Sequence, residues 1–119
     1  TIFFDFDGCL VENGSKFSKN PYRTNPITKN LNCIKNLQKI TNIEIIITTS
    51  RPKTEKKYIK DLLKRCEIKY RAIITDLMHS KRILVNDFAI TNPYPSSVAI
   101  NIPRNSDGLS LVLESIIKN

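Results

Sequence analysis

The chain has 119 residues, 40% of them hydrophobic and 25% charged, and its 19 basic and 11 acidic residues leave a formal net charge of +8. This size and composition are typical of one soluble globular domain, so we predict a single domain over residues 1–119. No apolar run approaches the roughly 18 residues that a membrane span needs, and no basic-then-apolar leader opens the sequence, so we expect a cytoplasmic protein without a membrane partner.

The charge and the cysteines restrict the function further. A positive field favours anionic ligands such as phosphate esters, nucleotides and nucleic acids. The lysines are dispersed, however, so the charge alone does not predict nucleic-acid binding. Cys9, Cys33 and Cys66 are widely spaced and odd in number, which predicts reduced thiols rather than a disulfide framework or a zinc site.

The chain opens on a short apolar run that predicts a buried strand, and two carboxylates, Asp5 and Asp7, follow it. Residues two apart on a strand point to the same side, so both carboxylates are expected to face one pocket. Gly8 then allows a sharp turn. Paired carboxylates repel each other, and a divalent cation such as Mg²⁺ relieves that repulsion. In that setting one carboxylate can act as a nucleophile and the other as a general acid and base.

The rest of the chain alternates between helical and strand patterns. Residues 11–27 are rich in turn-forming residues and predict a loop or flap. The further predicted elements are a helix over about 29–41 capped by Thr28, a strand over 43–49, a helix over about 53–66, strands over 72–75, 83–85 and 98–102, and a helix over 107–118. This order predicts an α/β domain with a mostly parallel sheet. Asp5, Thr49 and Asp87 each end a predicted strand, where such sheets place their sites.

The sequence Asp5-Phe6-Asp7-Gly8-Cys9-Leu10 resembles the first motif of the haloacid dehalogenase-like (HAD) hydrolases, with Cys9 where threonine is commoner. The resemblance implies a three-layer, Rossmann-like domain with a short flap, about 11–27, instead of a full cap. It also implies that Asp5 attacks phosphorus to form an aspartyl-phosphate. Asp7 then protonates the leaving group and afterwards activates water.

The strand that ends in Thr49-Ser50-Arg51 resembles the second motif of the same family. The resemblance implies that the Thr49 hydroxyl binds the transferring phosphoryl group, with Thr48 as the alternative. Ser50 and Arg51 are expected next to the phosphate, although Arg51 could instead face solvent.

Two further motifs are placed by the resemblance. Asp87 is similar to the acid of the fourth motif, which implies that Asp5, Asp87 and the backbone carbonyl of Asp7 hold Mg²⁺; Asn86 departs from the family pattern, which usually has Asp or Gly. Lys81 is assigned to the basic residue of the third motif, with Arg82 and Lys69 as competitors. Tyr94, in the turn-rich loop that follows, is either a substrate contact or a packing residue.

Together these motifs predict a Mg²⁺-dependent phosphomonoesterase that acts on a sugar phosphate or a related small phosphorylated metabolite. A phosphatase for nucleotides or nucleic-acid ends is an alternative suggested by the +8 charge. A non-catalytic HAD-like binding or regulatory module is another, suggested by Asn86 and the open choice of Lys81. The intact pair of Asp5 and Asp7 argues against it. The sequence does not predict the oligomeric state.

Overall fold

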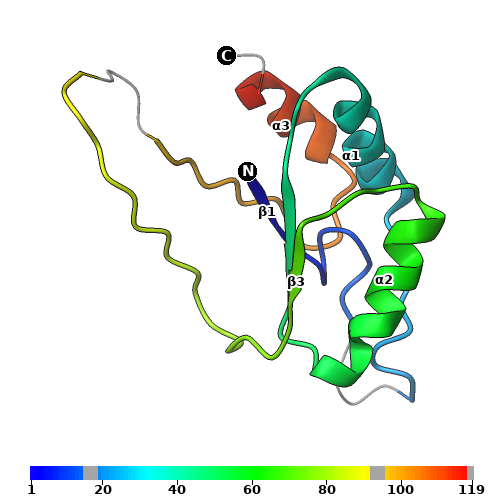
Figure 1. The fold of residues 1–119 in the computed structure, drawn as a ribbon. Helices are drawn as coiled ribbons and strands as arrows, with labels where there is room; N and C mark the ends of the chain where they lie inside the picture. The colour runs from blue at the N-terminus through cyan, green and yellow to red at the C-terminus, as the bar shows by residue number, and fades with distance from the viewer. Residues whose placement is uncertain (15–18, 92–95, 118–119) are drawn as a thin grey trace.

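The computed structural model describes residues 1–14, 19–91 and 96–117, which form a small α/β domain (Figure 1). Its sheet has three parallel strands in the order β1 (Ile2–Asp5), β2 (Ile45–Thr48) and β3 (Ala72–Ile74). Because all three run in the same direction, their carboxyl ends lie at one edge of the sheet, which we call the carboxyl edge. The α/β class and the parallel sheet are therefore confirmed.

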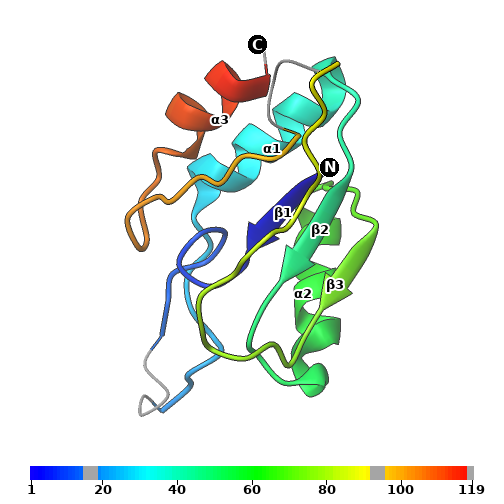
Figure 2. The same ribbon diagram turned by 90° about the vertical axis from the view of Figure 1, so that its left-hand side faces the viewer.

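The helices also follow the sequence pattern closely. They are α1 (Thr28–Ile40), α2 (Lys56–Arg65), which is preceded by the short 3₁₀ turn η1 (Lys53–Glu55), and α3 (Leu109–Ile117). Figures 1 and 2 show α1 and α2 on the same face of the sheet, with α3 beside α1. A three-layer, Rossmann-like layout is not confirmed by this arrangement and stays a prediction.

The start of α1 differs from the prediction that Thr28 caps it. The helix begins at Thr28 itself, and Ile27 occupies the N-cap position without a side-chain cap bond. Ile27 is buried, and its backbone N–H donates a 2.9 Å hydrogen bond to the carbonyl of Leu10. This contact fixes the chain just before the helix, so helical geometry is already established at Thr28.

The core lies between the sheet and the helices. Alternate strand residues face the helices and are buried, as a half-covered sheet requires. On the other face of the sheet, Phe3 is 53% exposed and Ile74 is 40% exposed. The buried side chains of this core come from all three strands and all three helices and include Phe4, Ile45, Ile47, Ile73, Leu31, Ile34, Ile59, Leu63 and Leu113.

The predictions of a fourth strand at 83–85 and a fifth at 98–102 are wrong. Both segments are described, and neither is a strand. They belong to an arm, residues 78–102 apart from 92–95, which extends away from the sheet (Figure 1). Residues 75–82 alone connect β3 to 83–85, whereas a parallel crossover usually takes about a dozen residues or more. The β-branched run therefore stays exposed, with Val85 at 87% and Ile90 at 96%.

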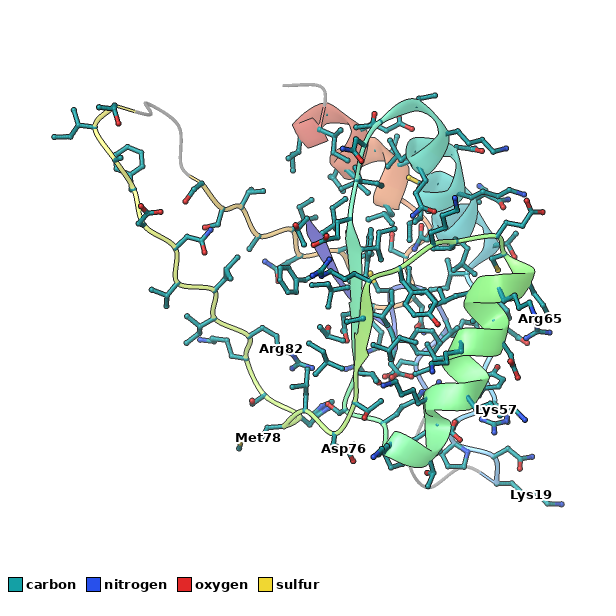
Figure 3. The ribbon with its side chains drawn as sticks, viewed as in Figure 1. Lys19, Lys57, Arg65, Asp76, Met78 and Arg82 are labelled. Carbon is teal, nitrogen blue, oxygen red and sulfur yellow. The ribbon has the colours of Figure 1, made fainter. Side chains whose placement is uncertain are left out.

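Both ends of the arm are attached at the carboxyl edge. Before the arm, the backbone N–H of Asp76 donates to the carbonyl of Arg51 at 2.9 Å. After it, the N–H of Asn105 donates to the carbonyl of Gly8 at 2.8 Å. Figure 3 shows Asp76, Met78 and Arg82 at the base of the arm. The residue before the arm is therefore attached next to the second motif, and the residue after it next to the first motif. Among the described residues, no helix has the length and apolarity to cross a membrane.

Candidate active site

The carboxyl edge of the sheet gathers several of the residues that the sequence predicts to be functional. Asp5 is the last residue of β1 and stands opposite Thr48 of β2 in the parallel register. Asp7 and Thr49 follow these strands, and the Thr49 hydroxyl donates a 2.9 Å hydrogen bond to Oδ2 of Asp7. Side chains from neighbouring strands thus meet at this edge, which we take as the candidate active site.

The two threonines at the end of β2 have different partners. Thr48 Oγ1 donates to the carbonyl of Phe4 at 3.1 Å, a bond between neighbouring strands. Thr49 is fully buried, and besides binding Asp7 its hydroxyl accepts a 3.0 Å hydrogen bond from the backbone N–H of Arg51. This geometry places Thr49 rather than Thr48 against Asp7. Because Thr49 is fully buried and its hydroxyl is bonded to Asp7 and Arg51, that hydroxyl is not exposed to a phosphoryl group, in contrast to the prediction from the sequence.

Asp7 is fixed by a buried arginine. The Arg51 side chain is 2% exposed; its Nε donates to Oδ1 of Asp7 at 2.9 Å, and its Nη2 lies 2.8 Å from the same oxygen. Nη2 is not aligned for a hydrogen bond with any acceptor in the described part of the chain, so it acts as a charge rather than a donor. Arg51 therefore faces Asp7 rather than solvent, and half-buried Ser50 lies between Arg51 and Thr49 in the chain.

The far side of the Arg51 guanidinium is also occupied. Nη1 donates to the carbonyl of Tyr22 at 2.7 Å and to Oε1 of Glu55 at 3.3 Å. The same Glu55 oxygen accepts a 2.6 Å hydrogen bond from Arg23 of the flap. The guanidinium carbon also lies within 5.8 Å of the centres of three aromatic rings, which adds cation–π attraction; these are Phe6, Tyr22 and Tyr58.

Asp5 is the exposed member of the acidic pair. Partial burial of its carboxyl is the strongest influence and raises its pKa; the charge of Arg82 opposes that rise, and the charge of Asp7 adds to it. Weaker contributions from the backbone N–H of Phe6 and from His79 lower the pKa, but the net direction is upward. The ionised form of Asp5 is therefore disfavoured in this protein, and a bound cation would stabilise it.

The loop that follows the acidic pair requires glycine at position 8. Gly8 has a φ of +83°, and a Cβ built there would lie 3.3 Å from Cγ of Arg104. Its N–H donates to the carbonyl of Val11 at 2.7 Å, which closes the turn. Because a side chain would both strain the backbone and crowd Arg104, Gly8 shapes this part of the site.

Two basic side chains lower the pKa of Asp5, and Arg82 has a stronger effect than His79. Lys69 precedes β3 and exchanges two hydrogen bonds with Gln38, at 2.7 and 3.2 Å, at the opposite edge of the sheet. Lys81 is exposed and is not among the charges that shift the pKa of Asp5, whereas Arg82 is. Nη1 of Arg82 itself donates to the carbonyls of Met78 and Ser80, at 3.3 and 2.7 Å. The electrostatic effect on Asp5 favours Arg82 over the predicted Lys81, and the choice between them stays a prediction.

Asp87 does not join the other predicted residues. It lies on the exposed arm, where its backbone carbonyl accepts a 2.6 Å hydrogen bond from Ser96. Within residues 1–14, 19–91 and 96–117, no group of three or more acidic, histidine or cysteine side chains is placed to hold a metal. Tyr94 lies outside the described residues. The structure thus brings together Asp5, Asp7, Thr49 and Arg51, and leaves Asp87 apart.

The oxygen donors at this edge are of the kind that Mg²⁺ binds, but two of the three expected donors lie there. Carboxylate and carbonyl oxygens are the protein ligands that Mg²⁺ takes. The Asp5 carboxylate and the Asp7 carbonyl supply two such donors beside β1, while the third expected donor, Asp87, is on the arm. The fit is therefore partial, and Mg²⁺ stays a prediction.

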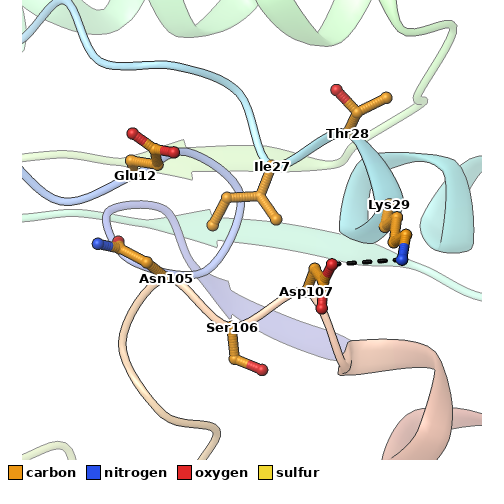
Figure 4. A pocket seen from close by; sticks show the side chains of 7 residues that line it. All are labelled: Glu12, Ile27, Thr28, Lys29, Asn105, Ser106 and Asp107. Carbon is orange, nitrogen blue, oxygen red and sulfur yellow. Dashed lines mark ion pairs between the residues drawn. The ribbon is translucent and has the colours of Figure 1, made fainter.

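A separate open pocket of about 490 Å³ lies at the base of the flap (Figure 4). Lys29 and Asp107 form an ion pair of 3.4 Å across it. None of its lining residues is a predicted site residue, so we do not assign it to the active site. It is lined by Glu12, Ile27, Thr28, Lys29, Asn105, Ser106 and Asp107.

Comparison with known proteins gives no relative: no family model, no curated protein and no solved structure matches this chain. Any inference about its function therefore rests on the residues and geometry described above.

Sequence reasoning missed the residues that surround Arg51. Glu55 had a weak signal, because it stands four residues after Arg51 at the start of a helix, a spacing at which opposite charges meet. Arg23 and Tyr22 had none, since they lie in an irregular flap, and a contact between positions 23 and 55 has no local pattern.

Proposed function

We propose that this chain is a HAD-like phosphatase that hydrolyses the phosphate monoester of a small metabolite through an aspartyl-phosphate on Asp5. The observation that supports this proposal is the difference between the two carboxylates. Asp5 is exposed to an incoming ligand, whereas Asp7 is held by Thr49 and Arg51. A nucleophile must be accessible, and a general acid must be held in place, so the two environments suit these two roles.

In the first half of the proposed reaction, a carboxylate oxygen of Asp5 attacks phosphorus in line with the ester bond. That bond breaks as the new P–O bond forms, and the leaving oxygen takes a proton from Asp7. Thr49 and Arg51 orient Asp7 through their contacts with its two oxygens. Arg82, whose charge reaches Asp5, is the side chain placed to attract the phosphoryl oxygens.

In the second half, Asp7 takes a proton from water, and the resulting hydroxide attacks phosphorus. The bond to Asp5 breaks, and inorganic phosphate leaves with Asp5 again ionised and Asp7 again protonated, as both were before the first half. Mg²⁺, when bound, would supply positive charge that offsets the charge of the phosphoryl group. Asp5 and the Asp7 carbonyl would hold it, and Asp87 would complete the set only if the arm brought it to the carboxyl edge.

The proposed substrate is a sugar phosphate or a similarly small ester. The insertion between β1 and α1 is limited to the flap, about 11–27, which is too short for a separate cap domain. Its two ends pair with each other, because the N–H of Glu12 donates to the carbonyl of Asn25 at 2.8 Å. The flap is attached to the domain by the N–H of Asn13, which donates to Oδ1 of Asn105 at 2.7 Å. A short, attached flap suits a small ester.

Phosphate release from sugar phosphates, nucleotides, a 5′-phosphorylated oligonucleotide and an aryl phosphate, with Mg²⁺ or with EDTA, tests the proposal. We expect Mg²⁺-dependent release that is greatest for a sugar phosphate and is absent in Asp5→Asn. Preference for the nucleotides or the oligonucleotide would transfer the proposal to that substrate class. No release from any substrate by folded protein would favour a non-catalytic module.

The raised pKa of Asp5 predicts how this carboxyl titrates in the protein without Mg²⁺. It should titrate at a higher pH than an ordinary aspartate, with a pKa of 3.8, and the ¹³C NMR shift of the carboxyl measures this. Removing a positive charge that lowers this pKa should move the titration further upward. We therefore expect Arg82→Gln to shift it to higher pH, while the neighbouring control Lys81→Gln leaves it in place. An equal shift in both variants would contradict the choice of Arg82.

A further inference from the structure

Four charged side chains form a continuous network from the flap to the proposed general acid. Arg23 of the flap contacts Glu55 through two hydrogen bonds, at 2.6 and 3.3 Å. Glu55 contacts Arg51 at 3.3 Å, and Arg51 contacts Asp7 at 2.8 and 2.9 Å. With Asp7 ionised, two arginines and two carboxylates make the network neutral, which is the usual requirement for burying charges. In the proposed reaction the network carries a net charge of +1 while Asp7 holds the proton that it donates.

Glu55 lies at the centre of this network, and it contacts none of the groups that react in the proposed mechanism. It is buried, although an unpaired glutamate is almost never found in that position. Its Oε1 is shared by Nη1 of Arg23 and Nη1 of Arg51, which hold it from two directions. Glutamate at this position therefore has a specific structural role, which is to hold the side of Arg51 that faces away from Asp7.

The orientation of Arg51 decides the orientation of Asp7. The Nε and Nη2 groups of Arg51 both meet Oδ1 of Asp7, which leaves Oδ2 to Thr49. On the opposite side, Nη1 is held by Glu55 and by the carbonyl of Tyr22. If Glu55 no longer holds Nη1, the planar guanidinium can rotate, and both of its contacts with Oδ1 change together.

We propose that Glu55 is a positioning residue for Asp7, acting through Arg51, and that Arg23 makes this positioning depend on the flap. This inference rests on the proposed function in one respect, because it takes Asp7 as the proton donor to the leaving group. The geometric part, in which Glu55 fixes Arg51 against Asp7, does not depend on that function.

The kinetic test compares substrates that need a proton with substrates that do not. An alkyl phosphate needs protonation of its leaving oxygen, whereas an aryl phosphate with an acidic phenol needs it much less. Misplacing a general acid should cost less than deleting one, which typically costs about 10²–10⁴-fold, so we expect Glu55→Gln to lower kcat for the alkyl phosphate by about tenfold or more. For the aryl phosphate, kcat should fall by less than about threefold, because its leaving group needs little protonation.

The controls separate positioning from a general loss of structure. Glu44→Gln removes another contact between a glutamate and an arginine, that of Glu44 with Arg71 at 3.5 Å. It should leave kcat unchanged for both substrates. Arg23→Gln alters a side chain that is 51% exposed, so it should fold even if Glu55→Gln does not. We expect it to show the same difference between substrates, but smaller. An equal loss on both substrates, or no loss on either, would overturn the inference.

A second measurement does not require activity. The Nε–H of Arg51 is buried and donates to Asp7, so it should give a slowly exchanging signal in a ¹⁵N NMR spectrum, assigned by its loss in Arg51→Lys. We expect faster exchange in Glu55→Gln and in Arg23→Gln, and no change in Glu44→Gln. If wild type releases no phosphate but this pattern is seen, the proposed function fails and the positioning stands. Unchanged exchange in Glu55→Gln would overturn the positioning whatever the activity.

Discussion

Replacing Asp7 by asparagine is expected to reduce phosphate release by about 10²–10⁴-fold, the typical cost of losing a general acid. It should also lower the free energy of unfolding by on the order of 3 kcal/mol, because it removes one partner of a buried ion pair. Arg51 is 2% exposed and, among the residues that the structure describes, would keep Glu55 as its one charged partner, at 3.3 Å. Urea unfolding at pH 7, beside a phosphate-release assay, measures both effects.

Asp5→Asn should abolish release as well, but with the opposite effect on stability. The pKa of Asp5 in the folded protein is raised, so its contribution to stability is fully present below the unfolded value of 3.8 and is lost as the pH rises through the folded pKa. At pH 7 the ionised carboxylate therefore destabilises the fold in the absence of a cation. Asp5→Asn removes this penalty, so it should unfold at a higher urea concentration than wild type.

Comparing the unfolding of Asp5→Asn with that of Asp7→Asn tests whether the two carboxylates have different environments. Asp61→Asn, on the exposed side of α2, controls for the loss of one negative charge from a basic protein. The stabilisation by Asp5→Asn should shrink as the pH is lowered toward 4, where wild-type Asp5 also becomes neutral. If Asp5→Asn and Asp7→Asn destabilise the protein equally, the distinction between an accessible and an anchored carboxylate is incorrect.

The second large effect is expected at Asn30, which is fully buried in α1. Its Nδ2 donates to the carbonyls of Cys9 and Ser106 at 2.7 and 2.8 Å, and its Oδ1 accepts a 3.3 Å hydrogen bond from the N–H of Leu109. Asn30→Leu keeps the branched shape and the number of heavy atoms but leaves three backbone groups, two partly buried and one buried, without this partner. At about 1–3 kcal/mol for each such group, the expected loss is on the order of 4 kcal/mol.

That loss would be a large part of the roughly 5–15 kcal/mol that stabilises a typical domain. Asn36→Leu is the matched control, since Asn36 lies on the exposed side of the same helix and should change stability little. Urea unfolding of both variants measures the difference. Similar unfolding midpoints for the two variants would mean that the hydrogen bonds of the Asn30 amide to Cys9, Ser106 and Leu109 do not stabilise the protein.

Local patterns predicted the three helices and the three paired strands. The β-branched run of β2 and the helical spacing of Leu31, Ile34 and Leu37 in α1 are both found where expected. Asp5, Asp7 and Thr49 could be placed together because strand ends in a parallel sheet share one edge.

The remaining contacts are between residues distant in sequence. Residues 83–85 have the composition of a strand, but composition does not reveal whether a neighbouring strand is within reach, and here the segment is exposed. Asn30 interrupts the apolar stripe of α1, and nothing in the sequence indicates that its partners lie more than 70 residues away, at Ser106 and Leu109. Polar contacts of this kind leave no periodic pattern.

The arm affects how the protein behaves at high concentration. It presents Ile83, Val85 and Ile90 to solvent in a chain that carries a net charge of +8. Charge repulsion keeps copies apart at low ionic strength, and its range falls from about 30 Å at 0.01 M salt to about 8 Å at 0.15 M. Attraction between exposed apolar side chains does not weaken in the same way. Colloidal stability should therefore be greatest in dilute buffer and should decrease as salt is added.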